Sequence, residues 1–409
     1  MIIRKRSDES MKVIIAIDSF KGSLSSMEAG SAIKEGIRKA KPDAEIIVKP
    51  LADGGEGTTD ALISGLGGKR IDLTVTGPMG EPVDCYYGIL ENTASANDGV
   101  SCGHTAVMEM ASAAGITLLP DGSRNPLEAT TYGVGEMILH AMENGCLDFV
   151  IGIGGSATND GGIGMLKALG FEFLDKYGCD VGEGGQALSK VSTIKSEMVN
   201  SKLALCNFKV ACDVTNPLCG ENGATYIYGP QKGVTLEMRE DLDQGMANFA
   251  AQTAKYFGTD FSDYPGAGAA GGLGFTFLSY LNAALTPGID LIINAVGLES
   301  ELLISSEKPD VKSHPAGRQL IVVTGEGRLD HQTAMGKAPV GVARLAKKYG
   351  AKVIAFAGSV TEDAIACNEA GIDAFFPIVR NITTLEEAMK PENAKKNLAA
   401  TAEQVFRLL

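Results

Sequence analysis

The sequence predicts an α/β protein of two domains: a doubly wound, flavodoxin- or Rossmann-like domain with a parallel sheet, built from both chain ends, and a second α/β domain inserted into it. Three observations support this prediction. Apolar, strand-like runs alternate with helical patterns at the start of the 409-residue chain, the same alternation returns near its end, and the part between has many glycines and long joints. Alternating strands and helices favour parallel sheets that carry helices on both faces.

The first elements follow a strand–helix–strand–helix order. Short apolar runs predict strands at 12–17 and 45–49. An amphipathic pattern behind serine caps predicts a helix at 26–40, and a second helix is expected at 58–66. The glycine-rich stretch at 53–57 leads into that second helix.

The last part of the chain repeats this order. Strands are expected at 319–324, 352–357 and 374–378, and helices at 334–349, at 363–370 and after Pro391. We therefore assign residues 1–77 and 288–409 to the first domain and 78–287 to the inserted one, which carries a predicted hairpin at 83–90 and a polar loop at 94–103. Open α/β sheets bind ligands beyond the carboxyl ends of their strands, so we expect the active site in the cleft between the two domains.

Composition narrows the class of protein. With 44% hydrophobic residues the chain can bury a large core, and a formal net charge of −14 without a Lys/Arg-rich block argues against nucleic acid or an anionic membrane as partner. Its eight cysteines contain no C-x-x-C pair, which favours free thiols over a disulfide framework. No signal peptide or long apolar run is recognisable, so we expect a cytoplasmic protein; a homodimer and a start at Met1 or Met11 stay open.

The segment 149–162 has the composition of an anion site. An apolar strand leads directly into glycines and small polar residues, followed by a helix-like stretch. Glycines let a ligand reach backbone N–H groups, and the N-terminus of the following helix favours negative charge. A phosphate group suits such a turn. The candidate phosphate-binding residues are Gly154, Gly155, Ser156, Thr158, Asn159 and Asp160.

Two strand ends near the start of the chain carry charged residues. Lys21 follows the first strand close to Ser19, and its ammonium group could neutralise a phosphate or a carboxylate. Asp53 and Glu56 stand on the glycine hinge before the second helix, where carboxylates suit a hydrated metal ion or a substrate hydroxyl. A solvated lysine and an N-capping aspartate are the structural alternatives.

Two strand ends later in the chain add to the candidate site. Asp213 follows an apolar strand and is a candidate base or metal anchor, whereas an Asn-Pro turn by itself explains Asn216. Arg328 and Asp330 follow the strand predicted at 319–324. The guanidinium can bind a carboxylate or phosphate through two parallel hydrogen bonds, or it can form a local ion pair that closes the loop.

Other activities fit parts of the sequence. Gly152-x-Gly154-x-x-Ala157 follows a strand and precedes acidic residues at a suitable distance, so an NAD(P)-dependent oxidoreductase acting on a small hydroxy acid is the main alternative. The formal G-x-G-x-x-G at 266–271 follows Tyr-Pro instead of a strand, and no Walker A motif is present. A non-catalytic acid-binding module is the third class.

Several segments, in the same order across nearly the whole chain, resemble the type-1 glycerate kinase family. They lie at 18–25, 51–58, 151–162, 211–217, 229–233, 265–274 and 324–330. The resemblance implies ATP-dependent phosphorylation of D-glycerate by in-line phosphoryl transfer, with Mg²⁺ accompanying ATP. The 2-hydroxyl is the expected acceptor and 2-phosphoglycerate the expected product, while the residues themselves leave the 3-hydroxyl open.

Under this interpretation the candidate residues take specific roles. The 154–160 turn would contact the phosphates of ATP, and Lys21 and Arg328 would hold the carboxylate of glycerate or neutralise the transferred phosphoryl group. An acid must orient the accepting hydroxyl, for which Asp213 is the first candidate and Asp330 the second. The expected substrate-binding residues are Ser19, Lys21, Asp53, Glu56, Asn216 and Arg328, of which Asp53 and Glu56 could instead position a metal.

Overall fold

The computed structural model describes residues 11–91, 103–120, 122–306 and 319–409, so the polar loop expected at 94–103 lies outside the described residues apart from Gly103. The chain divides into two compact units. Unit 1 holds the described residues of 11–53, 64–66 and 292–409, and unit 2 holds those of 54–63 and 67–291. The borders between the units thus fall near residues 53 and 291.

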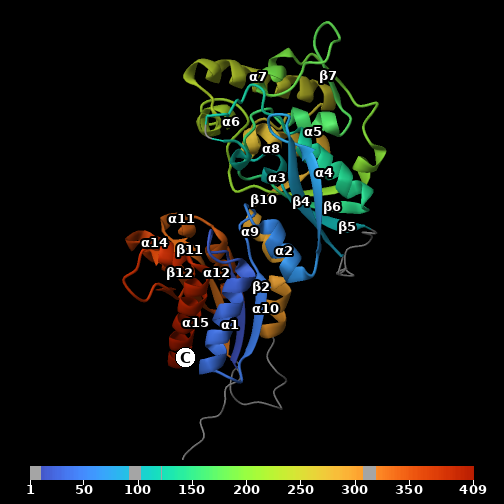
Figure 1. The fold of residues 1–409 in the computed structure, drawn as a ribbon. Coiled ribbons are helices and arrows are strands. Elements are labelled where there is room, and N and C mark those ends of the chain that lie inside the picture. Colours follow the sequence, from blue (N-terminus) through green and yellow to red (C-terminus); the bar gives the residue numbers. More distant parts are fainter. Residues whose placement is uncertain (1–10, 92–102, 121, 307–318) are drawn as a thin grey trace, which may run out of the picture. The chain divides into compact units, whose positions relative to one another are not determined.

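Unit 1 contains a five-stranded sheet in the order β13-β12-β11-β1-β2, and all of its neighbouring strands run parallel. Strands β2, β11 and β12 of this sheet are labelled in Figure 1. Numbered along the chain, this is the 2-1-3-4-5 order of flavodoxin-like folds, in which the strand order reverses beside the first strand. The predicted flavodoxin-like domain built from both chain ends is confirmed. The strands are β1 (Met11–Ile17), β2 (Glu45–Pro50), β11 (Gln319–Leu329), β12 (Lys352–Val360) and β13 (Ala374–Pro377).

Helices cover this sheet on both faces. Every residue of β1 is buried, as expected for a parallel strand with helices on each side. Ser25 and Glu28 form a capping box at the start of α1, in agreement with the predicted serine cap. The helices that lie wholly or partly in unit 1 are α1 (Ser26–Ala40), α2 (Thr58–Leu66), α9 (Gly288–Ala295), α10 (Leu298–Ser306), α11 (His331–Ala334), α12 (Ala338–Lys348), α13 (Ala366–Glu369), α14 (Leu385–Met389) and α15 (Pro391–Leu408).

Strand β11 is longer than predicted, which changes the setting of Arg328. The apolar run predicted a strand that ends at 324, but β11 continues to Leu329 because it stays paired with β12. Gly325 permits the continuous pairing: it has a φ of 145°, and a Cβ atom there would lie 1.8 Å from the carbonyl oxygen of Phe356. Arg328 therefore projects from a strand and not from a loop.

Two predicted helices of unit 1 are divided. The helix expected at 334–349 consists of the short α11 and a separate α12, because Gly336 between them has a φ of 121° that interrupts the helical path. The helix expected at 363–370 begins as a 3₁₀ turn at Glu362–Ile365 and continues as α13.

Unit 2 contains a six-stranded mixed sheet in the order β10-β9-β6-β5-β4-β3 and a separate pair of strands, β7 and β8. Strands β5, β6, β9 and β10 run parallel, and β3, β4 and β5 pair antiparallel. The strands are β3 (Lys69–Thr76), β4 (Pro82–Leu90), β5 (His104–Glu109), β6 (Cys146–Gly152), β7 (Glu172–Leu174), β8 (Thr193–Lys195), β9 (Asn207–Ala211) and β10 (Ala284–Thr286).

The hairpin predicted at 83–90 is wrong. Those residues form the single strand β4, and the hairpin turn lies earlier, where the N–H of Gly77 donates to the carbonyl of Glu81 and Gly80 has a φ of 88°. Only glycine adopts that backbone conformation without strain. The remaining helices of unit 2 are α3 (Ala111–Ala114), α4 (Tyr132–Glu143), α5 (Ile163–Ala168), α6 (Ala224–Tyr228), α7 (Leu236–Phe257) and α8 (Ala269–Leu281).

The glycine-rich segment 266–272 packs against the turn at 158–161. The N–H of Gly161 donates to the carbonyl of Gly271 at 2.9 Å, and a Cβ atom on Gly271 would lie 2.1 Å from the carbonyl oxygen of Thr158. These glycines therefore serve a close backbone approach, and the segment includes the first residues of α8, where Ala270, Gly271 and Gly272 depart from helical geometry. Among the described residues, no helix is both long and apolar enough to span a membrane.

Candidate active site

A cavity of about 630 Å³ opens at the carboxyl edge of the sheet in unit 1. Its walls come from the ends of β1, β11, β12 and β13 and from α14 and α15. Because the strand order reverses between β1 and β11, this edge is the usual ligand position of such a sheet. Of the site residues predicted from the sequence, the cavity brings together Ser19, Lys21, Asp53, Arg328 and Asp330.

Lys21 and Asp53 form an ion pair, with 3.4 Å between Nζ and Oδ2. The side chain of Lys21 is 65% exposed, so its ammonium group is also accessible to a ligand. Burial acts to lower the pKa of Lys21, but the charges of Asp53 and Asp18 outweigh burial and raise that pKa. Lys21 therefore stays protonated at neutral pH.

Asp18 is a buried carboxylate in the same cavity that was not among the predicted site residues. It accepts a hydrogen bond from the backbone N–H of Ser19 at 2.7 Å. Burial, followed by the negative charge of Asp53, raises the pKa of Asp18 to about 7. The negative charges of Asp18 and Asp53 thus repel one another, and a bound cation would reduce this repulsion.

Arg328 and Asp330 form the local ion pair that was one of the two sequence interpretations, with 3.5 Å between Nε and Oδ2. Asp330 also caps α11 by accepting hydrogen bonds from the N–H groups of Gln332 and Thr333. The hydroxyl of Thr333 in turn donates to Glu326 at 2.6 Å. The Arg328 side chain is 64% exposed and the Asp330 side chain 20%, so the guanidinium is the accessible member of the pair.

Glu56 lies in unit 2 and is exposed, and a different carboxylate holds the glycine hinge. Glu109, the last residue of β5, accepts hydrogen bonds from the N–H groups of Thr59 at 2.8 Å and Gly57 at 3.3 Å. It thereby satisfies donors at the start of α2. Burial raises the pKa of Glu109, partly opposed by these bonds. No local sequence signal pointed to Glu109, because its partners lie about 50 positions away.

Asp213 and Asn216 differ in exposure and in the groups that their side chains contact. Asp213 follows β9, is exposed, and accepts a hydrogen bond at 2.8 Å from the N–H of Gly288, the first residue of α9. Asn216 donates to the carbonyl of Asn222 at 2.8 Å and accepts from the hydroxyl of Tyr228 at 2.6 Å. Asn216 therefore stabilises its own loop, and Asp213, an exposed residue, holds the start of α9.

The predicted phosphate turn has an exposed outer half and a buried inner half. Gly154 and Gly155 are exposed, while Ser156, Thr158, Asn159 and Asp160 are buried. The backbone of the two glycines is thus the part of this turn that a ligand can reach from solvent.

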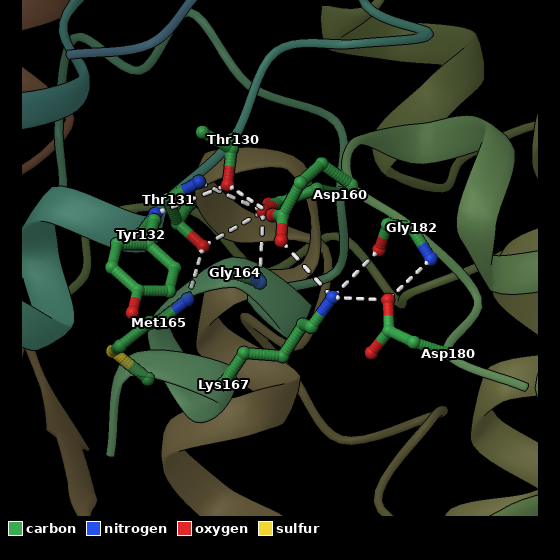
Figure 2. Close-up of polar contacts among 10 residues, drawn as sticks. Thr130, Thr131, Tyr132, Asp160, Gly164, Met165, Lys167, Asp180 and Gly182 are labelled. Atoms are coloured by element: carbon green, nitrogen blue, oxygen red, sulfur yellow. Dashed lines mark hydrogen bonds and ion pairs between the residues drawn. The ribbon is translucent and has the colours of Figure 1, made fainter. Parts of the chain in front are cut away.

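The carboxylate of Asp160 is fully engaged inside unit 2 (Figure 2). It accepts hydrogen bonds from the N–H and the hydroxyl of Thr131, both at 2.8 Å, and from the N–H groups of Gly162 and Gly164 at 3.1 and 3.3 Å. Burial raises the pKa of Asp160, and these bonds oppose that rise. The geometry gives Asp160 a part in holding the turn to the start of α4.

Lys232 is an ionisable residue at this turn that was not among the site residues predicted from the sequence. Its side chain is 1% exposed, and its Nζ atom donates to the hydroxyl of Ser156 at 2.6 Å and to the carbonyl of Thr158 at 2.7 Å. Burial lowers the pKa of Lys232 to about 7, although the charge of Asp160 acts in the opposite direction. Lys232 lies in the segment 229–233, which carries part of the family resemblance. That position is the sequence feature from which a functional role could have been inferred.

The chain matches the model of the glycerate kinase family over residues 13–409. It belongs to the glycerate kinase family. It is 45% identical to a glycerate kinase of Bacillus subtilis, with 97% of each chain covered, and 43% identical to a glycerate 2-kinase of Escherichia coli, with 96% of this chain and 98% of the relative covered. A crystal structure from Salmonella typhimurium, described provisionally as glycerate kinase 2, superposes with a TM-score of 0.84 at 41% identity over 97% of each chain.

Membership of the glycerate kinase family confirms the resemblance seen in the sequence, and nothing in these matches supports the oxidoreductase alternative. The segments that carry the resemblance build the features described above. Those at 18–25 and 324–330 line the cavity of unit 1, and those at 151–162, 229–233 and 265–274 form the glycine-rich turn and its supports.

Within the described residues, no group of three or more His, Cys, Asp or Glu side chains is arranged to hold a metal ion. A Mg²⁺ ion bound together with a nucleotide needs fewer protein ligands, because the phosphates and waters complete its coordination. Such an ion requires only one or two carboxylates, and both Asp18 and Asp53 line the cavity of unit 1.

Proposed function

We propose that this chain transfers the terminal phosphoryl group of ATP in line to D-glycerate, with 2-phosphoglycerate as the product. The observation that carries the proposal is the match to the glycerate kinase family over nearly the whole chain. Relatives named glycerate kinase and glycerate 2-kinase match over almost their full lengths, which supports the same acceptor. Exposed cations beside buried or partly buried carboxylates also suit a reaction between two anionic substrates.

The proposed roles of the side chains follow from charge and access. Phosphoryl transfer depends mainly on positioning and on neutralising negative charge. Lys21 and Arg328, both accessible, would neutralise the transferred phosphoryl group or hold the carboxylate of glycerate. Asp213 would orient the accepting hydroxyl and take up its proton, with Asp330 as the second candidate. Ser19 would contribute to substrate binding, whereas the engaged side chain of Asn216 would act only through its loop.

The contacts to phosphate and metal form a second part of the proposal. Gly154 and Gly155 offer exposed backbone to a phosphate, with Ser156, Thr158, Asn159 and Asp160 supporting them from the interior. Asp18 and Asp53 would hold Mg²⁺, which when bound supplies positive charge that neutralises phosphate oxygens. The exposed Glu56 is the alternative carboxylate for the metal or the substrate.

A cytoplasmic location and a homodimer complete the proposal. The seven described cysteines are free thiols, which supports a reducing compartment. Light scattering on the purified chain tests the homodimer directly.

A coupled assay of ADP release tests the activity. With ATP and Mg²⁺ present, the purified full chain should release ADP only when D-glycerate is added, and phosphorus NMR should show the product phosphorylated on the 2-oxygen. L-glycerate serves as the matched acceptor control, and NAD(P)⁺ in place of ATP serves as the cofactor control. Release of ADP that does not depend on glycerate, or reduction of NAD(P)⁺ with glycerate, contradicts the proposal.

A further inference from the structure

We propose that the cavity of unit 1 binds the nucleoside triphosphate, with the purine ring at its apolar end and the phosphates, including the one that is transferred, over its cationic end. The inference rests on the proposed kinase function and adds to it which unit binds the phosphoryl donor, and through which side chains. The sequence alone had associated the donor with the turn at 154–160 of unit 2.

The position of the cavity is the first argument. It lies at the carboxyl edge of a parallel sheet, where β1 stands between β2 and β11 and the strand order reverses. In open α/β sheets the connections on the two sides of such a reversal leave the sheet in opposite directions, and nucleotides bind in the resulting crevice.

The size of the cavity is the second argument. At about 630 Å³ it falls within the range of pockets, roughly 300–1,000 Å³, that enclose ligands of the size of a nucleotide. Glycerate is a three-carbon acid and would leave most of this volume unfilled. The cavity therefore suits the larger of the two proposed substrates.

The apolar end of the cavity is the third argument. Val379, Leu385 and Met389 line it and are 40%, 76% and 37% exposed. Leu385 and Met389 belong to α14, every residue of which is at least partly exposed. Phe20 and Ile378 also line the cavity and are buried. Adjacent apolar side chains exposed around one cavity are typical of a binding surface, and a flat purine ring would cover them.

Polar side chains that suit the ribose and the edge of the base stand in the same walls. Ser359, Thr383, Thr384 and Asn397 line the cavity and carry both hydrogen-bond donors and acceptors. A small number of such groups within a mostly apolar pocket sets the orientation of a bound ligand.

The cationic end is the fourth argument. Lys21, Arg328 and Lys337 line it together with the carboxylates of Asp18, Asp53, Glu326 and Asp330, of which Asp53 and Asp330 pair with Lys21 and Arg328. The side chains of Lys21 and Arg328 are largely exposed and stay accessible to an anion. Three cations suit a polyphosphate better than the single carboxylate of glycerate, and a divalent cation bound with the nucleotide would offset the acidic groups.

A tryptophan probe tests where the nucleotide binds. The chain contains no tryptophan, so Leu385→Trp introduces a single indole at the apolar end of the cavity. Leu236→Trp, on α7 of unit 2, is the matched control, because Leu236 is 75% exposed and Leu385 is 76% exposed. Each full-length variant is titrated with ATP, ADP, inorganic triphosphate and D-glycerate. We expect ATP and ADP to change the emission of Leu385→Trp saturably, while triphosphate and glycerate alone do not, and Leu236→Trp to respond to none of them.

Steady-state kinetics of Leu385→Asp give a second readout. A carboxylate at the apolar end removes apolar contact and repels phosphate, so the KM for ATP should rise about tenfold or more, while the KM for glycerate changes less than about twofold. Leu236→Asp is the surface control and should leave both values unchanged. Rescue of the ATP KM by Leu385→Met would show that an apolar contact is what Leu385 supplies.

The outcomes separate this inference from the proposed function. If the parent chain phosphorylates glycerate but Leu385→Trp does not respond to saturating ATP, or Leu385→Asp raises only the KM for glycerate, the inference is overturned and the kinase function stands. If the parent chain releases no ADP with glycerate but Leu385→Trp still responds to ATP and ADP, the proposed acceptor is wrong and the nucleotide site stands.

Discussion

The Nζ atom of Lys232 lies 2.6 Å from the hydroxyl oxygen of Ser156, although 76 positions separate the two residues in the chain. The same nitrogen donates to the carbonyl of Thr158 at 2.7 Å. Both acceptors belong to the inner half of the glycine-rich turn. A neutral amine has two hydrogens, so these two acceptors use all of its donors. The buried lysine therefore fastens this half of the turn, while Gly154 and Gly155 stay exposed.

The first prediction concerns how stability depends on pH through Lys232. Its pKa of about 7 in the folded chain lies below its ordinary value of 10.5, so between these values the unfolded chain binds a proton that the folded chain does not. Stability contributed by this group therefore rises with pH from about 7 to 10.5, and the full cost of burying the amine applies below pH 7.

Replacing Lys232 by Met should remove this pH dependence. We compare the free energies of unfolding of the parent chain and of Lys232→Met. The parent value minus the variant value should rise with pH in this window by up to about 1.4 kcal/mol per pH unit. Urea unfolding followed by circular dichroism at a series of pH values measures both free energies. Lys202→Met, at an exposed lysine, is the control and should give a constant difference. A constant difference for Lys232→Met would mean that the buried amine is charged throughout.

The second prediction concerns the exposed cations of the cavity. Lys21→Ala and Arg328→Ala should each lower kcat/KM for glycerate phosphorylation about 100-fold or more, because each removes a positioned charge near developing negative charge. Since both side chains are largely exposed, the melting temperature should hardly change. Arg38→Ala, at an exposed arginine of α1, is the surface control. Near-normal kinetics in both cavity variants would exclude this end of the cavity from the reaction.

The third prediction concerns Asp213. Asp213→Asn keeps the size of the side chain and an oxygen that can accept from the N–H of Gly288, but it removes the negative charge. If Asp213 takes the proton of the accepting hydroxyl, kcat should fall much more than KM changes. Asp263→Asn, at another exposed aspartate, is the comparison variant and should keep both constants. An effect of Asp213→Asn on KM alone would make Asp213 a binding residue.

The fourth prediction concerns the pairing of β11 with β12. Gly325→Ala should destabilise the protein by about 3 kcal/mol or more, because the new Cβ would meet the carbonyl of Phe356 at 1.8 Å and the backbone has a φ of 145°. Gly327→Ala, on the same strand, should change stability by less than about 1 kcal/mol, since its Cβ would have neighbours no closer than 3.8 Å. Thermal unfolding compares the two, and equal melting temperatures would contradict the steric argument.

Much of unit 1 followed from local sequence patterns. The helix at Ser26–Ala40 and the strands around it were predicted almost to the residue, because capping and apolar periodicity are properties of neighbouring residues. The extension of β11 to Leu329 could not be predicted in this way, since it depends on pairing with β12. The hairpin turn was likewise predicted at the wrong place: it joins β3 to β4, whereas the sequence placed it within β4, which contains a glycine.

The residues of the candidate site also fall into those that local sequence patterns predicted and those that they did not. Lys21, Asp53 and Arg328 could be chosen from the sequence because charged residues at strand ends share one edge of a parallel sheet. Lys232 and Glu109 could not, because each acts on backbone or side-chain groups at least 50 positions away.

The sequence by itself determined the alternation of strands and helices, the strand-end location of the charged residues, and the family to which the chain belongs. Only the tertiary structure decided that the side chains of the 156–160 turn face the interior and that the ends of β1, β11, β12 and β13 enclose one cavity together with α14 and α15. The physical reason is that burial and cavity shape arise from contacts between segments far apart in the chain. Periodicity and capping are local, so they specify each element but not what packs against it.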